Sequence, residues 1–179
     1  MTRPLPRPAA CLLSAAALLS LAACTPTLDW RVLRPEGTSA ELLFPCRPKS
    51  QHRQVVLAGR PTTMVLYACD AGDRTWGLIE ADVVDPTRVG PALQALRQAA
   101  AANLGAALPP LGPLAVPGAT PNDAGGTARL SGRRPDGQAV QMRLALFAHG
   151  TQVFQATVLG AHLAGDAEDG YFAAIRLDG

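Results

Sequence analysis

The N-terminal segment constrains the fold most, because it has the pattern of a secretory signal and leaves a shorter chain to form the domain. Arg3 and Arg7 give a positive start, and residues 9–20 form an apolar run that ends in small residues. These are the marks of a signal peptide. The run is also shorter than the roughly 20 residues that cross a bilayer comfortably. The predicted organisation is a signal peptide over residues 1–23, a lipidated tether over 24–29 and a single domain over 30–179.

The signal ends in Leu21-Ala22-Ala23-Cys24, which resembles the lipobox of bacterial lipoproteins. The resemblance implies cleavage just before Cys24, a diacylglycerol thioether on its sulfur and acylation of its amino group. Two or more acyl chains hold a protein stably on a membrane. Thr25 follows the cysteine in place of an aspartate, and by resemblance to known sorting rules this implies the periplasmic face of the outer membrane. The alternative is ordinary cleavage that releases a soluble periplasmic protein.

Cys46 and Cys69 are left as a pair, because Cys11 leaves with the signal and Cys24 carries the anchor. In an oxidising periplasm we expect them to form a disulfide. The alternative is a pair of metal-binding thiolates. It lacks further ligands, since the three histidines are scattered without metal-site spacing. We predict no metal and no cofactor.

The mature chain is close to neutral. Arg3 and Arg7 leave with the signal, so 14 of the 16 basic residues remain against 14 acidic residues. Nucleic-acid-binding domains present a basic patch or stripe, and we see none in the sequence, so no nucleic acid partner is expected. About 155 residues remain, a typical length for one domain.

Most of the mature chain has the pattern of short strands. Alternating or continuous apolar runs are bounded by turn residues, such as Arg134-Pro135-Asp136-Gly137. The predicted strands are residues 30–33, 40–44, 54–57, 63–69, 75–84, 127–133, 138–147 and 151–159. Residues 106–124 are rich in Pro, Gly and Ala, and we interpret them as a connection with one short strand near residues 114–116.

Two helices are predicted. Asp85 is a good N-cap and Pro86 fits the first helical position. The apolar stripe that follows has helical spacing and consists of Val89, Leu93, Leu96, Ala100 and Leu104. A closing helix should begin near Asp166, with Glu168 and Asp169 in its first turn and Tyr171, Phe172 and Ile175 buried. This order predicts an α+β fold: an antiparallel β-sheet of about six to eight strands flanked by two α-helices.

The order of motifs also resembles that of the PsbP-like families. An early strand ends in Phe44-Pro45, a late strand reads Val153-Phe154-Gln155-Ala156-Thr157-Val158, and Tyr171-Phe172 precedes Ile175-Arg176-Leu177. The resemblance implies an antiparallel sheet between helices, and such families include accessory proteins without catalysis. The chain departs from the pattern at residues 173–175, where a serine and an aromatic residue are usual.

Four residues are candidates for surface chemistry. Glu80 and Asp82 lie two apart on one predicted strand and so share a face. They could act as an acid–base pair or bind a cation, or they could mark a solvated strand face. Arg133 and Arg134 flank a turn and could meet an acidic partner or a lipid headgroup, or form a solvated hairpin end. No nucleophile–base arrangement is evident, so we predict no enzyme.

These features favour a non-enzymatic accessory lipoprotein that contacts another envelope protein, for which an open sheet edge offers strand addition. The alternative is a small-ligand carrier or sensor with an apolar pocket between sheet and long helix.

Overall fold

The computed structural model describes residues 27–163 and 165–177. Its elements are β1 (Arg31–Leu33), β2 (Ala40–Phe44), β3 (Lys49–Leu57), β4 (Arg60–Ala71), β5 (Arg74–Asp82), the 3-10 turn η1 (Pro86–Arg88), α1 (Val89–Asn103), β6 (Gly126–Arg133), β7 (Ala139–His149), β8 (Gln152–Gly160), α2 (Asp166–Ala173) and β9 (Arg176–Leu177). The signal and Cys24 lie outside the described residues, so cleavage and lipidation stay predictions.

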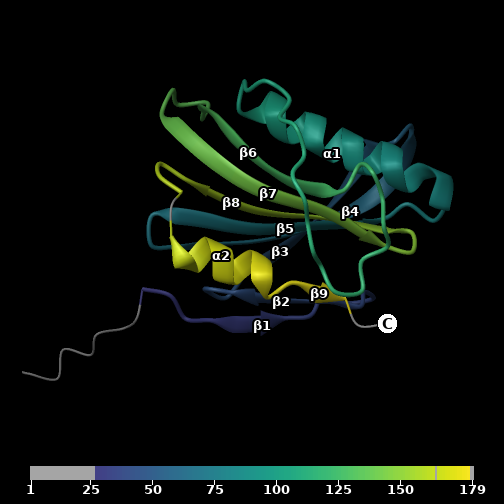
Figure 1. Cartoon of the computed structure of the whole chain (residues 1–179), viewed down its shortest axis with the longest axis horizontal. Helices are drawn as coiled ribbons and strands as arrows, with labels where there is room; N and C mark the ends of the chain where they lie inside the picture. The colour runs from purple at the N-terminus through teal and green to yellow at the C-terminus, as the bar shows by residue number, and fades with distance from the viewer. Residues whose placement is uncertain (1–26, 164, 178–179) are drawn as a thin grey trace, which may run out of the picture.

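Two antiparallel sheets form the fold. The larger has six strands in the order β3-β4-β5-β8-β7-β6, and the smaller has the order β1-β2-β9. Helix α1 covers one face of the large sheet, whereas α2 and the small sheet lie on its other face (Figure 1). The predicted α+β class, with an antiparallel sheet and two α-helices, is confirmed.

One core lies between α1 and the large sheet. The predicted stripe of α1 is buried along its length, and Leu93 at its centre has no exposed surface. It shares a core with Leu144 and Leu146 of β7 and with Val153 of β8. Residues two apart on a strand face the same way, so the alternation in β7 delivers these leucines to the helix.

The second core is aromatic and lies on the opposite face. Tyr171 of α2 contacts Phe44 of β2 and Trp76 of β5 edge-to-face, with ring centroids 5.5 Å and 5.3 Å apart. Edge-to-face pairs place the positive rim of one ring against the negative face of the other. Through these contacts α2 and the small sheet share one core with the large sheet.

The start of the long helix differs from the prediction. The Asp85 carboxylate accepts a hydrogen bond from the Thr87 amide at 2.9 Å, as an N-cap should, but it caps η1. Helix α1 then begins at Val89 after a short 3-10 turn. The Arg88 guanidinium explains this geometry, because it donates to the carbonyls of Val83 and Leu57 and ties the turn to two strands.

The connection between α1 and β6 crosses from one face of the large sheet to the other (Figure 1). The strand predicted near residues 114–116 is absent there, so that prediction is wrong. A single bridge pairs Gly112 with Thr127 instead. Proline has no amide donor for a ladder, and Pro113 and Pro117 flank the segment. The crossing ends beside β9, where the Leu177 amide donates to the Pro117 carbonyl at 2.9 Å.

The closing helix α2 begins at Asp166 with three acidic residues in its first turn, as predicted. It ends at Ala173, two residues before Ile175, so Ile175 does not belong to the buried face of the helix. Ile175 is nevertheless buried, at 1% exposure, in the segment between α2 and β9.

Candidate functional site

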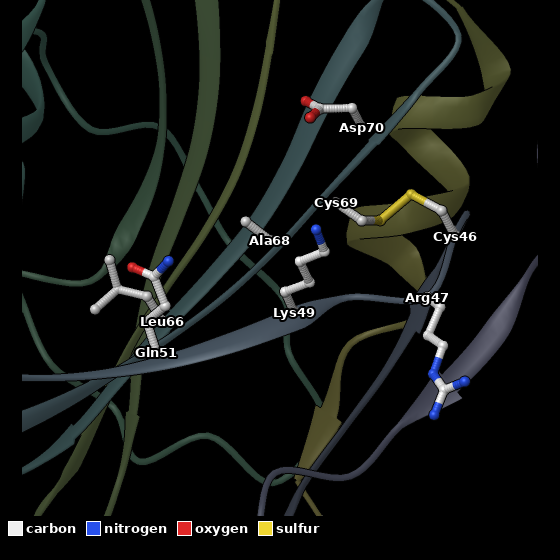
Figure 2. Close-up of a pocket in the computed structure, with 8 residues that line it drawn as sticks. All are labelled: Cys46, Arg47, Lys49, Gln51, Leu66, Ala68, Cys69 and Asp70. Atoms are coloured by element: carbon white, nitrogen blue, oxygen red, sulfur yellow. A yellow bond between two sulfur atoms is a disulfide. The ribbon is translucent and has the colours of Figure 1, made fainter.

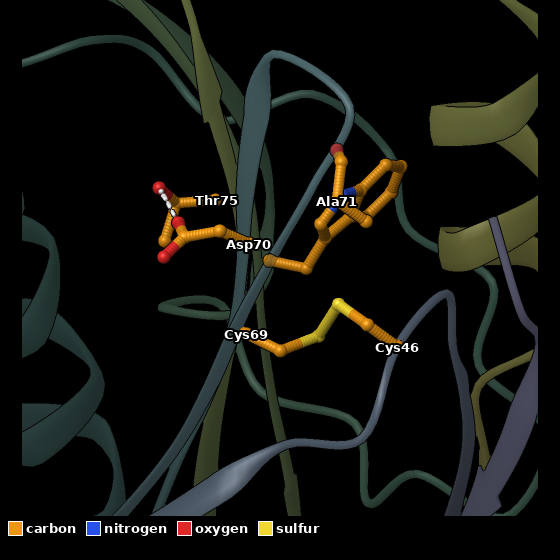
Figure 3. The surroundings of a disulfide bond; sticks show 6 residues. Cys46, Cys69, Asp70, Ala71 and Thr75 are labelled. Atoms are coloured by element: carbon orange, nitrogen blue, oxygen red, sulfur yellow. Dashed lines mark hydrogen bonds between the residues drawn. A yellow bond between two sulfur atoms is a disulfide. The ribbon is translucent and has the colours of Figure 1, made fainter. Parts of the chain in front are cut away.

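The predicted disulfide between Cys46 and Cys69 is confirmed, with Cα atoms 6.1 Å apart. It joins the loop after β2 to strand β4 (Figure 3). β3 begins at Lys49, three residues after Cys46, and pairs with β4 from its first residue. The bridge therefore fixes the point at which β3 enters the large sheet.

β3 is an edge strand of unusual regularity. It pairs with β4 one residue to one along all nine positions, without a bulge, and it contains no proline. The hairpin turn is Ala58-Gly59, with φ of 48° and 78°. Positive φ at both positions of a two-residue loop is typical of a type I′ turn, whose twist matches that of paired strands. Residues 49–54 are all exposed.

The turn geometry determines which backbone groups of β3 are free. Leu57 and Arg60 close the two-residue turn, and the closing pair of such a hairpin exchanges hydrogen bonds. Pairs then alternate along the ladder. It follows that every second residue from Leu57 back to Lys49 bonds to β4. The residues between them direct their N–H and C=O groups away from the sheet: Ser50, His52, Gln54 and Val56.

Cations lie along this edge without acidic neighbours in sequence. No aspartate or glutamate occurs between Glu41 and Asp70, whereas Arg47, Lys49 and Arg53 fall within that stretch. Lys49 and Arg53 are four residues apart, so their side chains share one face of β3. None of the ion pairs formed within the described part of the chain involves any of these three cations.

A groove of about 480 Å³ lies at the start of β3. Its lining side chains come from β3, β4 and the loop before β3, and they include Arg47, Lys49, Gln51, Leu66, Cys69 and Asp70 (Figure 2). The Asp70 carboxylate accepts a hydrogen bond from the Thr75 hydroxyl at 2.6 Å. Two cations without an ion-pair partner, Arg47 and Lys49, therefore line the same groove as Asp70, whose carboxylate is already hydrogen-bonded to Thr75.

Glu80 differs from the prediction of a solvated strand residue, because it is only 8% exposed. It lies on the face of β5 opposite α1, with Val65 and Phe154 as register partners. Desolvation raises the pKa of Glu80; the nearby His52 opposes this effect and Asp82 adds to it. Glu80 and Asp82 share a face as expected, but burial makes Glu80 part of the interior rather than a surface site.

The other surface candidates have local roles. The Asp82 carboxylate accepts from the Val84 amide at 2.7 Å, which stabilises a turn where Val84 has a φ of 63°. The Arg133 guanidinium donates to the Gly137 carbonyl at 2.7 Å and so closes the β6–β7 turn. Arg134 is exposed at the same turn. The structure brings Arg133 and Arg134 together at the β6–β7 hairpin, whereas Glu80 and Asp82 lie on β5. The four candidates do not form one site.

Over 27–163 and 165–177, no three His, Cys, Asp or Glu side chains come together as a metal site. Within the same ranges, no helix has the length and apolarity needed to span a membrane.

The sequence predicted this strand only over residues 54–57, whereas β3 begins five residues earlier, at Lys49. Lys49 to Arg53 is entirely polar and lacks the alternation that marks a half-buried strand. The usable signal was the run of 28 positions between Glu41 and Asp70 without a carboxylate.

No protein-family model matches the chain, and no curated protein matches it significantly.

Proposed function

We propose that the chain is a lipid-anchored, non-enzymatic accessory domain on the periplasmic face of the outer membrane, which binds another envelope protein. The observation that carries this proposal is β3. It is a nine-residue edge strand whose exposed first six residues lie outside both cores. Its free backbone groups and unpaired cations offer a surface that can recognise another chain.

Two features support the location. Leu21-Ala22-Ala23-Cys24 resembles a lipobox, and disulfides persist in oxidising compartments such as the periplasm. The Cys46–Cys69 bridge fits a chain that folds after export. A tether of a few residues would hold the domain, and with it β3, close to the membrane.

A small-ligand carrier with a pocket between sheet and α1 is the competing proposal. Apolar side chains occupy that space: Ala92 and Leu93 of α1 and Leu144 and Leu146 of β7 have no exposed surface. The β3 edge therefore has the stronger support as the recognition surface.

In-cell crosslinking followed by pull-down from the membrane fraction tests the proposal, with Cys24→Ala as the comparison. We expect a discrete envelope protein to be recovered with the wild type, and Cys24→Ala to leave the membrane fraction and lose that partner. Recovery of only abundant membrane proteins would contradict the accessory role. Retention of Cys24→Ala in the membrane would contradict the anchor.

A further inference from the structure

We infer that an extended acidic segment of a partner protein adds antiparallel to β3 as a seventh strand of the large sheet, with its carboxylates opposite Lys49 and Arg53. This inference rests on the proposed function and names the chemistry of the partner. Strand addition gains affinity from main-chain hydrogen bonds and specificity from alternate side chains. Both components can be read from the geometry of β3.

The main-chain component comes from the outward-facing residues. Ser50, His52, Gln54 and Val56 direct their amides and carbonyls away from β4, as the type I′ turn requires. Proteins usually protect such an edge by a bulge, a proline, a short strand or charged side chains. Along its nine paired residues β3 has neither a bulge nor a proline, so its protection is the charge of Lys49 and Arg53, which repels cationic strands and attracts acidic ones. The outward amides and carbonyls of β3 therefore form an uninterrupted row that can pair with a strand of similar length.

The side-chain component selects the partner. Side chains directly opposite each other on adjacent strands interact, and opposite charges stabilise the pair. Lys49, Gln51, Arg53 and Val55 follow one another on the face of β3 that points toward the α1 side. An antiparallel partner strand matches them when every second residue is, in order, apolar opposite Val55, acidic opposite Arg53, polar opposite Gln51 and acidic opposite Lys49. The residues between these positions can be of any type. The acid opposite Lys49 also lies next to the groove that contains Arg47.

A second copy of the chain matches this edge less well. Two copies of β3 in full overlap about a twofold axis would set Arg53 opposite Arg53, and an axis at Gln51 would set Lys49 opposite Arg53; like charges opposite each other destabilise a sheet. The cations thus disfavour self-association in these registers and favour an acidic strand. A lipid surface could attract the same charges, but it does not present the regularly spaced donors and acceptors that would pair with the outward amides and carbonyls of β3.

The blocked peptide acetyl-Thr-Val-Thr-Glu-Thr-Thr-Thr-Glu-Thr-amide is a direct probe of the full purified protein. Hydrogen exchange followed by NMR should show slower exchange on binding at Ser50, His52, Gln54 and Val56. The amides of Gln51, Arg53 and Val55 already bond to β4 and should change little. Binding that perturbs β3 without this alternation would overturn the inference.

Lys49 is the only lysine of the chain, which allows a zero-length test. Carbodiimide joins a lysine amine to a carboxylate, so the peptide should become linked at Lys49. Lys49→Arg keeps the charge and should abolish the crosslink while peptide affinity stays within about twofold. A crosslink of undiminished yield in Lys49→Arg would reveal an amine other than that of Lys49 and overturn the assignment.

Charge reversal provides the matched control. Lys49→Glu with Arg53→Glu should weaken peptide binding by about tenfold, because two attractive cross-strand pairs become repulsive. Arg133→Glu with Arg134→Glu makes the same change in net charge at the β6–β7 hairpin and should leave affinity unchanged. If both double variants lost peptide affinity equally, binding would depend on net charge alone, and the inference would be overturned.

Two further measurements separate the inference from its rivals. Gln54→Pro removes one outward amide but keeps the backbone bonds to β4. It also removes the side-chain hydrogen bond from Gln54 to Thr63 of β4, so Gln54→Ala is its control, and Gln54→Pro should bind the peptide more weakly than Gln54→Ala. Anionic phosphatidylglycerol vesicles should bind no better to wild type than to the Lys49→Glu/Arg53→Glu variant; strong charge-dependent vesicle binding would overturn the inference in favour of lipid. If in-cell crosslinking recovers a partner that this variant still binds, the inference fails while the accessory function stands.

Discussion

The hydroxyl of Tyr171 donates a hydrogen bond to the carbonyl oxygen of Gly77 at 2.8 Å. The two residues are 94 positions apart, and the bond joins α2 to β5, one of the two central strands of the large sheet. Tyr171 has no exposed surface, and burial raises its pKa, so the hydroxyl stays protonated and remains a donor. This contact orients α2 within the aromatic core.

Tyr171→Phe keeps the ring contacts and removes only this donor. A buried hydrogen bond contributes about 1 kcal/mol to stability, and an acceptor left unpaired can raise the cost to about 2 kcal/mol. We expect a loss in that range. Urea unfolding should show a lower midpoint with an unchanged slope, since the surface exposed on unfolding stays the same. Unchanged stability would mean that the Thr157 hydroxyl, 3.4 Å from the same carbonyl, satisfies it alone.

Loss of the disulfide should destabilise the domain through the unfolded state. Cys46 and Cys69 are 23 positions apart, and closing a loop of this length stabilises by about 3 kcal/mol in the chain-entropy model. Cys46→Ser with Cys69→Ser should lose about that amount in urea unfolding under oxidising conditions. Wild type in excess reductant should match the variant, and a clear difference between the two would point to a packing effect of the serines.

Alkylation gives an independent check of the same bond. Both cysteines are partly exposed, so a free thiol at either position would be accessible to the reagent. Peptide mapping should find Cys46 and Cys69 unlabelled without reductant and labelled after reduction. Labelling of both in the oxidised protein would exclude the bridge in solution.

Glu80→Gln should change the pH dependence of stability. Desolvation raises the pKa of Glu80 above its ordinary value of 4.5, so the folded state binds its proton more tightly than the unfolded state does. The free energy of unfolding therefore falls as pH rises from 4.5 through the folded-state pKa. Glutamine does not titrate, so the variant should gain stability relative to wild type between pH 4 and pH 7.

Thermal melts of both proteins across this pH range measure the effect. Asp82→Asn is the useful comparison, because Asp82 is exposed and lies on the same face of β5. The charge of Asp82 adds to the raised pKa of Glu80, so Asp82→Asn should reduce the fall in stability with pH only in part. A constant difference between Glu80→Gln and wild type at all pH values would contradict a raised pKa at Glu80.

Two glycines should respond to alanine in opposite directions. A Cβ atom at Gly132 would lie 2.1 Å from the Leu104 carbonyl oxygen, where the end of α1 approaches β6. Backbone must shift to admit it, so Gly132→Ala should cost about 1–3 kcal/mol. Gly170 lies in α2 with nothing within 4 Å of a Cβ, and Gly170→Ala should gain up to about 1 kcal/mol. Chemical denaturation of both variants measures the contrast, and destabilisation by Gly170→Ala would contradict the open environment.

The layers of the fold were predictable because local patterns and tertiary packing agree. Leu144 and Leu146 alternate with smaller or polar residues, and Leu93 and Leu96 follow helical spacing. Each pattern therefore indicated the face that the structure buries. The Cys46–Cys69 bridge was predictable as well, because these two cysteines remain once Cys11 is assigned to the predicted signal and Cys24 to the predicted anchor.

The start of β3 and the position of Glu80 could not be read in the same way. Lys49 to Arg53 has no apolar face, because an edge strand with both faces exposed is held by its ladder and not by burial. The burial of Glu80 depends on which distant residues cover it, and a pattern within β5 does not contain that information. Glu41 shows the same limit: it is 4% exposed because Arg34 and Arg176 pair with it from either end of the chain.

The disulfide also sets the route by which mechanical load enters the domain. Tension on the chain from its N-terminal side passes through β1 and β2 and reaches Cys46 before it reaches β3. The bridge to Cys69 then transfers the load to β4, which has a neighbouring strand on each side. β1 and β2 lie on the loaded side of the bridge, whereas the stretch from 46 to 69 is shielded from tension carried along the chain, so β3 keeps its register.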